Sequence, residues 1–493
     1  MRTNFKGEIK MMELILHENE LNLKTLETNI FKMVCEEGCR IMAEILRELD
    51  KSIEKNRDKK IYRHKGTRDT VIKTLMGEVP YSRVVYEKKC ESVDKKHIYL
   101  LDEYLGFDNI GLISSNLAEK MAEMVCLTSF KESAKNISEL TGQTISHGGI
   151  WNLTQKLGAR IEKEEEKDMI LYKNNESKGE REIDVLFEEA DGIMIKMQGK
   201  DRLKGKNQEM KIAIFHEGWE KEGKKRYRLH NKQVVNGFED ISTFTIRMQA
   251  KIASIYNTDE IKVKIFNSDG AGGLKEIVDD ETIRQLDPFH VKKAIQRATK
   301  NEDIKKALTK LYEEKKIEEL LEKIDIYANS MEDENEDKKL RKLYEYLNEN
   351  KEDLIPYKAR ELEEKLPEAP EGIEYRGMGA CEHNVFLAAG KRMKRRGSSW
   401  SKSGANNLGK ILALKVSDKL RMTLEELTKV TMPEAAEKEI STVLSSSKAP
   451  KYDGKGYEGR VSSRPFANCA RTNGRDAIDG MFDLRPLSEL RMI

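Results

Sequence analysis

The sequence predicts a mixed α/β protein in which an all-helical segment interrupts the sheet-forming part of the chain. From residue 185 to residue 299, apolar runs typical of strands and apolar residues at helical spacing follow one another in the order β-β-β-α-β-α-β-α, which indicates a mixed α/β layer. Residues 300–366 contain almost no Gly or Pro and are dense in Lys and Glu, which favours helices alone. A helical region and a small β element precede both.

The N-terminal part is predicted to contain one helical region and one hairpin. Residues 1–57 form the helical region, because apolar residues recur every three or four positions over most of it. Residues 58–105 follow, with a basic connector at 58–69 and alternating apolar and polar residues at 70–89 around Met76-Gly77-Glu78. Such alternation about a glycine predicts a β-hairpin.

Residues 106–165 form a third region, predicted to be helical and to include a helix-turn-helix that binds DNA. Within it, residues 130–158 contain two helical segments separated by a turn at Thr141-Gly142, and Ser146 is placed to cap the second helix. The second helix of such a motif can lie in the major groove of DNA. Helix pairs of this outline are also common packing units.

The sheet-forming core is predicted in two parts, residues 183–299 and 376–440, on either side of a helical insertion at 300–375. A charged spacer at 163–184 leads into the first part. Strands are expected at 185–199, 209–220, 226–235, 261–270 and 283–290, and helices at 238–257 and 291–300. Residues 441–493 are rich in Ser, Gly, Lys and Arg and are expected to form a basic flexible tail.

The composition excludes several classes of protein. The 493 residues include 89 Lys and Arg and 87 Asp and Glu, so the formal net charge is only +2. A uniformly basic nucleic-acid coat is therefore excluded, and a DNA-binding surface has to come from local segregation of charge. With 32 Gly and 9 Pro, the chain is not collagen-like. The six Cys residues lack zinc-finger spacing.

We expect a cytoplasmic protein without a membrane partner. No apolar run approaches the roughly 18 residues of a membrane-spanning helix. The N-terminal residues have neither an uninterrupted apolar stretch nor a small-residue cleavage site, so no secretory signal is predicted.

Three acidic residues stand out by their position beside strands or at the start of a helix. Asp191 follows a predicted strand, Asp269 ends another, and Glu382 opens a predicted helix. Two acids at strand ends and a third on a helix laid across them can hold Mg²⁺, which prefers oxygen ligands. A pair of such ions about 3.5–4 Å apart stabilises the attacking and leaving oxygens of a displacement at phosphorus.

Each acid also has a simpler interpretation. Asp191-Gly192 is compatible with the type I′ turn of a hairpin. Asp269 is placed to cap a following helix, and Glu382 is compatible with an ordinary solvated helix position. The helical insertion lies between Asp269 and Glu382, and this order favours a shared site.

Several blocks of sequence resemble those of one family. The blocks are RHKGTRDTVIKTLMGEVPYSRVVYEKK, EADGIMIKMQ, KIAIFHEGW, FNSDGAG, LDPFHVKKAI and CEHNVFLAAGKRMKRRGSSWSKSGANNLGKIL. In this order they are similar to bacterial insertion-sequence transposases of the ISLre type, which are also catalogued as an uncharacterised protein family and are distantly similar to Mutator-like transposases. The resemblance covers residues 30–415.

The resemblance implies an RNase H-like catalytic core with a DDE triad and a helical insertion between the second Asp and the Glu. Asp191, Asp269 and Glu382 match the three acids in turn and would be the metal ligands. The implied cofactor is Mg²⁺, with Mn²⁺ as a substitute. A family signature of Cys or Asp, two residues and His matches Asp287 and His290, which are therefore predicted to support the site.

A basic run at 391–402 is predicted to bind DNA, since it contains six Lys or Arg, no acid, and follows Glu382. Its cations would meet phosphates, and its tryptophan would stack on an unpaired base. The alternative is a solvated basic face with the tryptophan in the core. The predicted contacts are Lys391, Arg392, Lys394, Arg395, Arg396, Trp400 and Lys402.

Together these features predict a DDE-type transposase that cleaves transposon ends and joins them to target DNA, acting at the nucleoid in a bacterial cytoplasm. The implied partners are double-stranded DNA, as transposon ends and target, and a second copy of the chain, because two ends must be held together. Two alternatives remain open. One is a metal-dependent nuclease with the same triad, and the other is a DNA-binding regulator built on residues 130–158 with a degenerate catalytic core.

Overall fold

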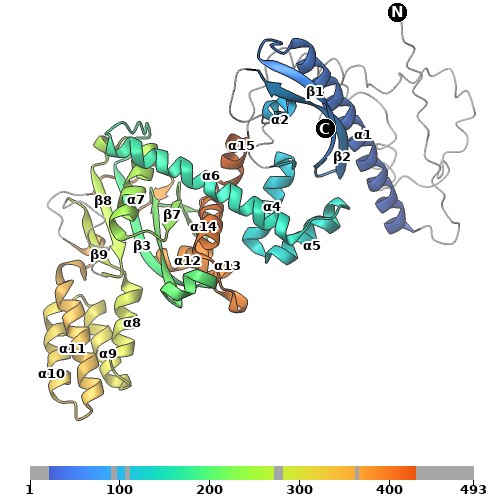
Figure 1. Ribbon diagram of the computed structural model, residues 1–493. Helices are drawn as coiled ribbons and strands as arrows, with labels where there is room; N and C mark the ends of the chain where they lie inside the picture. The colour runs from blue at the N-terminus through green and yellow to red at the C-terminus, as the bar shows by residue number, and fades with distance from the viewer. Residues whose placement is uncertain (1–21, 90–96, 106–110, 271–280, 361–365, 429–493) are drawn as a thin grey trace, which may run out of the picture. The chain divides into compact units, whose positions relative to one another are not determined.

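Five strands form the main sheet of the protein (Figure 1). They are β3 (Val185–Lys196), β4 (Asn207–His216), β7 (Gln233–Gly237), β8 (Val263–Ser268) and β9 (Ile283–Leu286). Their spatial order is β7-β4-β3-β8-β9, with antiparallel pairing among β7, β4 and β3 and parallel pairing among β3, β8 and β9. The predicted mixed α/β class is therefore confirmed.

The structure is a computed structural model that describes residues 22–89, 97–105, 111–270, 281–360 and 366–428, without the side chains of Arg396, Leu427 and Thr428. These ranges all fall within one compact unit, Met1–Ala436. The predicted tail at 441–493 lies outside the described residues. No helix in the described ranges has both the length and the apolar composition that crossing a membrane requires.

Strand β3 runs without a break through Asp191 and Gly192. It pairs with β4 from Phe187, opposite His216, as far as Lys196. The interpretation of Asp191-Gly192 as a hairpin turn is therefore wrong. The strand continues because the residues after the glycine, including the fully buried Ile195, belong to the core.

Helices cover both faces of this sheet. On one face, α7 (Ile241–Ile255) packs through Phe244 against Leu186 and Ala190 of β3. Successive residues of a strand point to opposite faces, so Ile193 faces the other way. It joins a larger core formed with α4 (Ser115–Leu127), α6 (His147–Lys173) and α14 (Lys402–Val416).

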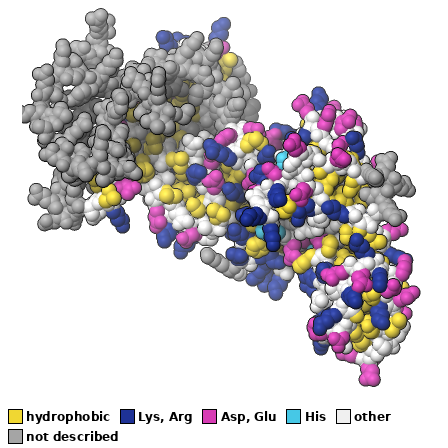
Figure 2. All heavy atoms as spheres, turned by 180° about the vertical axis from the view of Figure 1, so that it is seen from behind, with side chains coloured by type: hydrophobic (Ala, Val, Ile, Leu, Met, Phe, Trp, Pro, Cys, Tyr) yellow, Lys and Arg dark blue, Asp and Glu magenta, His cyan; other side chains and the backbone are white. Residues whose placement is uncertain are grey.

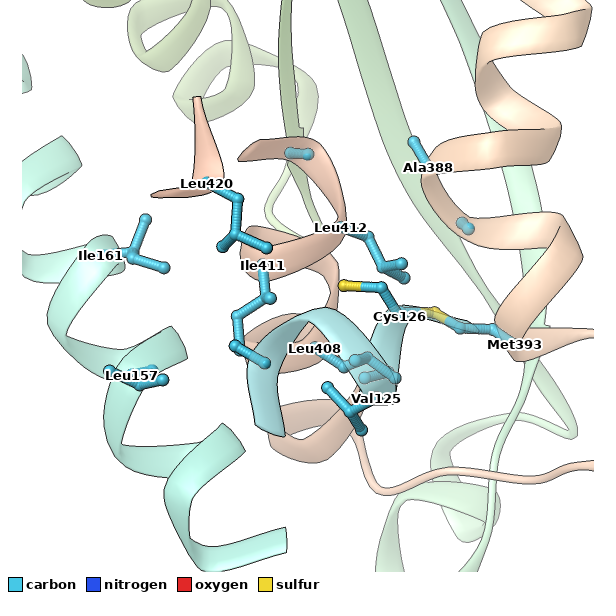
Figure 3. Close-up of a cluster of buried hydrophobic side chains, with 14 of the residues drawn as sticks. Val125, Cys126, Leu157, Ile161, Ala388, Met393, Leu408, Ile411, Leu412 and Leu420 are labelled. Atoms are coloured by element: carbon cyan, nitrogen blue, oxygen red, sulfur yellow. The ribbon is translucent and has the colours of Figure 1, made fainter. Parts of the chain in front are cut away.

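The larger core joins segments that are far apart in the sequence (Figure 3). Leu157 of α6, Ile411 of α14 and Val125 of α4 all belong to it, as does Leu420 of α15 (Leu420–Thr428). Burying a side chain of this size stabilises the fold by roughly 1.5–3 kcal/mol. The segment after the insertion is therefore tied to residues more than two hundred positions earlier, because both bury the same apolar surface.

The N-terminal residues form a helix packed on a hairpin. The elements are α1 (Leu23–Asn56), β1 (Tyr62–Lys73), β2 (Glu78–Lys88) and the short α2 (Leu100–Tyr104). The predicted helix and hairpin are confirmed in the described residues, but the chain enters β1 at Tyr62, within the predicted connector. The connector prediction was wrong because β1 is mostly exposed at this end and therefore lacks apolar alternation.

The predicted helix-turn-helix consists of α5 (Phe130–Thr141) and the start of α6. The turn and the cap are confirmed, because Gly142 has a φ of 64° and the Ser146 hydroxyl accepts a hydrogen bond from the Gly149 N–H at 3.0 Å. Helix α6 then packs closely on α14: a Cβ added at Gly158 would lie 2.3 Å from the Asn407 carbonyl oxygen. This part of α6 is a packing helix, and its DNA-reading role remains a prediction.

Helix α6 is also longer than predicted and includes half of the predicted charged spacer. It continues to Lys173, with Met169 buried. The spacer prediction was wrong over these residues because charge there does not mean exposure. The Glu165 carboxylate, for example, accepts hydrogen bonds from Arg247 at 2.6 Å and from the fully buried Lys410 at 2.7 Å.

Helices fill most of the predicted insertion at 300–375, but a short strand at Ile373–Glu374 lies within the predicted bounds, so the insertion is not all-helical as predicted. It contains α9 (Glu302–Glu313), α10 (Ile317–Asn329) and α11 (Glu334–Glu349), which pack with one another and with α8 (Pro288–Ala298) (Figure 1). Leu308, Leu320 and Leu340 are fully buried among them. The same cluster includes Leu286 at the end of β9, so the insertion is built directly onto the sheet.

The chain returns from the insertion to the sheet through short elements. Two helical turns at Lys351–Asp353 and Tyr357–Ala359 are followed by β10 (Ile373–Glu374), which pairs with β5 (Trp219–Lys221), itself paired with β6 (Tyr227–Leu229). Helix α12 (Cys381–Val385) continues through a π-helical turn (Phe386–Gly390) into α13 (Lys391–Met393). A Cβ on Gly390 would lie 3.3 Å from Ile193 of β3, so this helical segment lies directly on the sheet.

A buried cluster of charges links α6, α7 and α14. The Arg247 guanidinium of α7, 5% exposed, donates to Glu239 and Glu165 at 2.6 Å each, and Lys410 also donates to Glu165. Removing one member of such a cluster leaves a buried charge without its counter-ion, which is far more costly than losing an exposed pair.

We expect Arg247→Met to lower the free energy of unfolding by about 3 kcal/mol, because Glu239 loses its cation in a buried place and Glu165 keeps only Lys410. Equilibrium urea unfolding followed by fluorescence measures this. The matched control is Arg341→Met in α11, whose pair with Asp337 is half exposed and whose loss should leave the transition in place. Equal stability of the two variants would show that the buried cluster does not hold these helices together.

Candidate active site

Three acidic residues lie at the same level on three adjacent parallel strands. Ala190 of β3 is in register with Ser268 of β8, and Ser268 is in register with Leu286 of β9. The residues that follow these three are Asp191, Asp269 and Asp287. The Asp287 N–H donates to the Ser268 carbonyl at 2.8 Å, which continues the ladder to this level. In open α/β sheets, ligands bind outside the carboxyl ends of the strands. Asp269 and Asp287 lie there, and Asp191 lies within β3, where its parallel pairing with β8 ends.

The electrostatics of Asp191 reflect this crowding. Burial raises the pKa of the Asp191 carboxyl, and the negative charges of Asp269 and Asp287 raise it further. The hydrogen bond from the Gly192 N–H, at 2.7 Å, and the nearby His290 act in the opposite direction. Like charges gathered at one edge favour the binding of a cation, which offsets their repulsion.

Asp287 and His290 are both next to Asp191, as the sequence signature implied. The buried Asp287 caps α8, because its Oδ1 accepts a hydrogen bond from the Phe289 N–H at 2.9 Å. One residue further on, His290 has its Nε2 3.8 Å from Oδ2 of Asp191. Asp287 therefore fixes the first turn of α8, and that turn carries the imidazole to the acid.

Glu382 is the second residue of α12 and is exposed. Its neighbour Cys381 is buried, and burial together with the charges of Glu189, Asp191, Asp287 and Asp269 raises the pKa of the Cys381 thiol. The start of α12 therefore borders the acidic strand ends. Within the described residues, no three His, Cys, Asp or Glu side chains are drawn together closely enough to form a ready metal site.

The donor set nevertheless has the chemistry that a hard divalent cation requires. Asp191 would supply carboxylate oxygens from within β3 and Asp269 from just after β8, and Glu382 would supply another from the adjacent helix. Mg²⁺ prefers such ligands and usually keeps several waters or substrate phosphates, so a complete cage of protein ligands is not needed. These three residues are the ones that would hold the ion.

The basic run at 391–402 is only partly available to DNA. Arg392 is buried, donates to the Val125 carbonyl at 2.8 Å and lies over the Trp400 ring, and burial lowers its pKa to about 10. Trp400 is 8% exposed and donates from Nε1 to the Met393 carbonyl. The structure removes these two residues from the predicted DNA surface, because their polar groups are already used inside the core.

The other cations of the run point outward. Lys391, Lys394, Arg395 and Lys402 are exposed, and the side chain of Arg396 lies outside the described part of the chain. Figure 2 shows Lys and Arg side chains gathered beside histidine on one face of the molecule. The run therefore has a buried half that packs α13 on the core and an exposed half that can meet phosphates.

Residues 16–430 match the protein family described as Uncharacterised protein family (UPF0236). The chain belongs to this family. It is 26% identical over 397 residues to a Streptococcus gallolyticus protein named UPF0236 protein in vanSb 3′region, in an alignment that covers 78% of this chain and 81% of the relative. A UPF0236 protein of Caldanaerobacter subterraneus subsp. tengcongensis is 24% identical over 412 residues, with 82% and 77% covered.

A further UPF0236 protein of the same Caldanaerobacter strain is 24% identical over 309 residues, covering 61% of this chain and 60% of the relative. Its printed name joins eleven locus designations, and the name of the relative that aligns over 412 residues joins four. These names assign no activity.

In this UPF0236 chain, sequence reasoning missed Glu189 altogether. Glu189 lies on β3, two residues before Asp191, and is fully buried. Its carboxylate accepts hydrogen bonds from the backbone N–H groups of residues 379, 380 and 381 at 3.2 Å each. Burial and the charge of Asp287 raise its pKa to about 7. The one available signal was a pair of glutamates inside an otherwise apolar strand.

The helical insertion also contacts the site. The hydroxyl of Tyr346 in α11 donates to the backbone carbonyl of Asp269 at 2.8 Å, and burial raises the pKa of Tyr346, so it remains a donor. Asn350 packs beside Gly270, where an added Cβ would lie 2.9 Å from its Oδ1. The insertion therefore holds the backbone that carries the second acid.

We expect Tyr346→Phe to loosen the segment around Asp269, because its carbonyl loses the hydroxyl donor. The free energy of unfolding should fall by about 1 kcal/mol, and amide hydrogen exchange at residues 264–270 should become faster. Tyr344→Phe on the same helix is the control, since it leaves this hydrogen bond in place. Unchanged exchange at residues 264–270 in Tyr346→Phe would show that α11 does not hold the acid.

Proposed function

We propose that the protein is a DDE-type DNA transposase with an RNase H-like core, in which Asp191, Asp269 and Glu382 are the catalytic acids. The observation that carries this proposal is the placement of Asp191 and Asp269 on adjacent parallel strands, at the level where the pairing of β3 with β8 ends, with Glu382 on the helix that packs beside them. A site rich in carboxylates at this position suits chemistry at a phosphodiester that needs divalent cations.

The sheet supports the RNase H-like part of the proposal. Three antiparallel strands in chain order, β3, β4 and β7, are followed by β8 and β9, which add in parallel on the other side of β3. This connectivity is the one expected for an RNase H-like core. The helical insertion between β9 and α12 matches the interruption that the family resemblance implies.

The reaction would proceed in two steps. In the first, water attacks the phosphodiester at a transposon end, and the bond to the 3′ oxygen breaks to release a 3′-OH. In the second, that 3′-OH attacks a phosphodiester of target DNA, so one bond forms as another breaks and no oxidant or reductant is needed. Bound Mg²⁺, or Mn²⁺ in its place, supplies stabilisation of the attacking and leaving oxygens.

The chain's own residues orient this chemistry. Asp191 and Asp269 present their carboxylates from a rigid sheet, and His290 holds a hydrogen-bonding nitrogen beside Asp191. The exposed cations Lys391, Lys394 and Arg395 lie a few turns after Glu382 and would contact DNA phosphates. Phosphate contacts position the DNA and carry no base information.

The multiplicity of the relatives supports a mobile element. One relative's name joins eleven locus designations in a single genome. A gene that moves by copying or reinsertion is expected to occur at many loci, whereas a single-copy regulator is not. Because transposition requires two ends to be held together, we also propose that at least two copies of the chain assemble on DNA.

A second candidate is a DNA-binding regulator that has lost catalysis. It is favoured by one observation: Glu382 is exposed, and within the described residues no three acidic, histidine or cysteine side chains converge as a metal site. A regulator would bind DNA without cutting it under any cation condition. A nuclease would cut without joining the product to target DNA.

Replacing any one of the three acids should abolish strand cleavage while end binding persists. We expect Asp191→Asn, Asp269→Asn and Glu382→Gln each to reduce cleavage of a duplex carrying the gene's terminal sequence at least 100-fold, since each removes a cation ligand. Gel analysis of labelled ends measures cleavage, and anisotropy measures binding. Asp184→Asn, just before the start of β3, is the control. Near-normal cleavage by the Asp191 variant would refute the assignment.

Binding to DNA should depend on salt through the exposed cations after Glu382. Changing Lys391, Lys394 and Arg395 together to Ala should weaken binding to all sequences and flatten the slope of log K against log[salt] by about 2–3, or roughly 0.9 per lost phosphate contact. The control changes three exposed lysines of the insertion, Lys338, Lys339 and Lys342. An unchanged slope in the first variant would place its cations away from DNA.

A further inference from the structure

The carboxylate of Glu189 is the acceptor for the start of the helix that carries Glu382. Its Oε2 accepts from the Gly379 N–H and the Cys381 N–H, and its Oε1 accepts from the Ala380 N–H, all at 3.2 Å. A fourth donor, the side-chain amide of Asn267 on β8, reaches Oε2 at 2.9 Å. Three consecutive backbone N–H groups on one buried carboxylate make a dense and directional attachment.

This attachment starts two residues from the first acid. Residues two apart on a strand share a face and are separated by roughly 6.6 Å. The side chains of Glu189 and Asp191 therefore point to the same side of β3. Glu189 holds the start of α12, and Asp191 is one of the proposed catalytic acids. Because Glu382 directly follows the last of the three N–H groups, its backbone is fixed relative to Asp191 through a single strand.

A chain of buried amides fixes the orientation of the Glu189 carboxylate. The Tyr357 backbone N–H donates to the side-chain carbonyl of Gln285 at 3.0 Å. The side-chain NH₂ of Gln285 in turn donates to the side-chain carbonyl of Asn267 at 3.0 Å. The Asn267 amide then donates to Glu189. Each amide accepts on one side and donates on the other, so the chain across β9 and β8 ends on a carboxyl oxygen of Glu189, which accepts.

The backbone before α12 is shaped for this contact. Gly379 has a φ of +132°, a conformation that other residues rarely adopt, and this lets its N–H turn toward Glu189 together with the next two. A Cβ built there meets no atom within 4 Å, so the requirement is conformational and not one of space. The start of α12 is therefore held by the Glu189 acceptor on β3 and by the backbone conformation of Gly379.

We propose that Glu189 is a positioning residue that sets the start of α12 against β3 and thereby places Glu382 opposite Asp191 and Asp269. This inference rests on the proposed function for its catalytic consequence, but the attachment itself can be tested without DNA. A misplacement of about 1 Å at a reacting centre can cost 100-fold in rate, so loss of this attachment should act on the chemical step.

The test uses the full-length chain with Glu189→Gln, which puts an NH₂ group where an acceptor must be. We expect the rate constant of end cleavage at saturating DNA to fall about 100-fold, while the affinity for the ends changes less than twofold. Amide exchange at residues 379–385 and alkylation of the buried Cys381, followed by mass spectrometry, should both accelerate. Glu188→Gln is the matched control, because Glu188 is equally buried on the same strand and faces the other way.

Gly379→Ala tests the same attachment from the helix side and serves if Glu189→Gln fails to fold. It should reproduce the loss of cleavage with retained binding, since the strained backbone withdraws the N–H groups. Normal cleavage by either folded variant, or exchange at residues 379–385 no faster than in Glu188→Gln, would overturn the proposal. If the wild-type chain cleaves no DNA, the proposed function fails, and the exchange and alkylation results alone decide whether Glu189 positions the helix.

Discussion

The parallel pairing of β3, β8 and β9 is the constraint on which the rest of the structure depends. Its register puts the residues after Ala190, Ser268 and Leu286 at one level. Three acids that are far apart in the sequence therefore lie side by side. Parallel neighbours need long crossover connections, and here α7 provides the first one. Burial raises the pKa of Asp191, and the charges of Asp269 and Asp287 raise it further. The sheet tolerates this crowding because the ladder and the two flanking cores hold the strands in place.

Buried polar contacts also hold the segments around the sheet in place. A backbone N–H withdrawn from water needs an acceptor, and three N–H groups at the start of α12 share the two oxygens of one carboxylate on β3. The insertion has a core of its own, yet Tyr346 reaches the carbonyl of Asp269. The bundle is therefore more than an appended unit, because it holds the backbone of one acid while Glu189 holds the helix of another.

The sequence alone was enough to predict the elements with strong periodicity, including most of the helical insertion and the strands around Asp191 and Asp269. It placed Asp191 after a strand, whereas β3 continues through it to Lys196, and it merged β6 and β7 into one strand. The sequence was insufficient where the same type of residue occurs both in the core and on the surface. The basic run was predicted to bind DNA, yet two of its residues, Trp400 and Arg392, stack on each other inside the core. The exposed start of β1 lacks the alternation of apolar and polar residues that predicts a strand, so it was predicted to be a connector. Glu189 was missed because its partners are backbone groups 190 to 192 residues further along the chain, and backbone donors leave no signal in a sequence.

The most direct test of the central claim is a strand-transfer assay with the wild-type chain, a labelled duplex carrying the gene's terminal sequence, a supercoiled target plasmid and Mg²⁺ or Mn²⁺. If Asp191 of β3 and Asp269 after β8 form a transposase site with Glu382, the label becomes covalently joined to the plasmid through the 3′ end of the duplex, and sequencing across the junctions finds that end intact. If the chain binds the duplex under these conditions but neither cuts nor joins it with either cation, the account is contradicted.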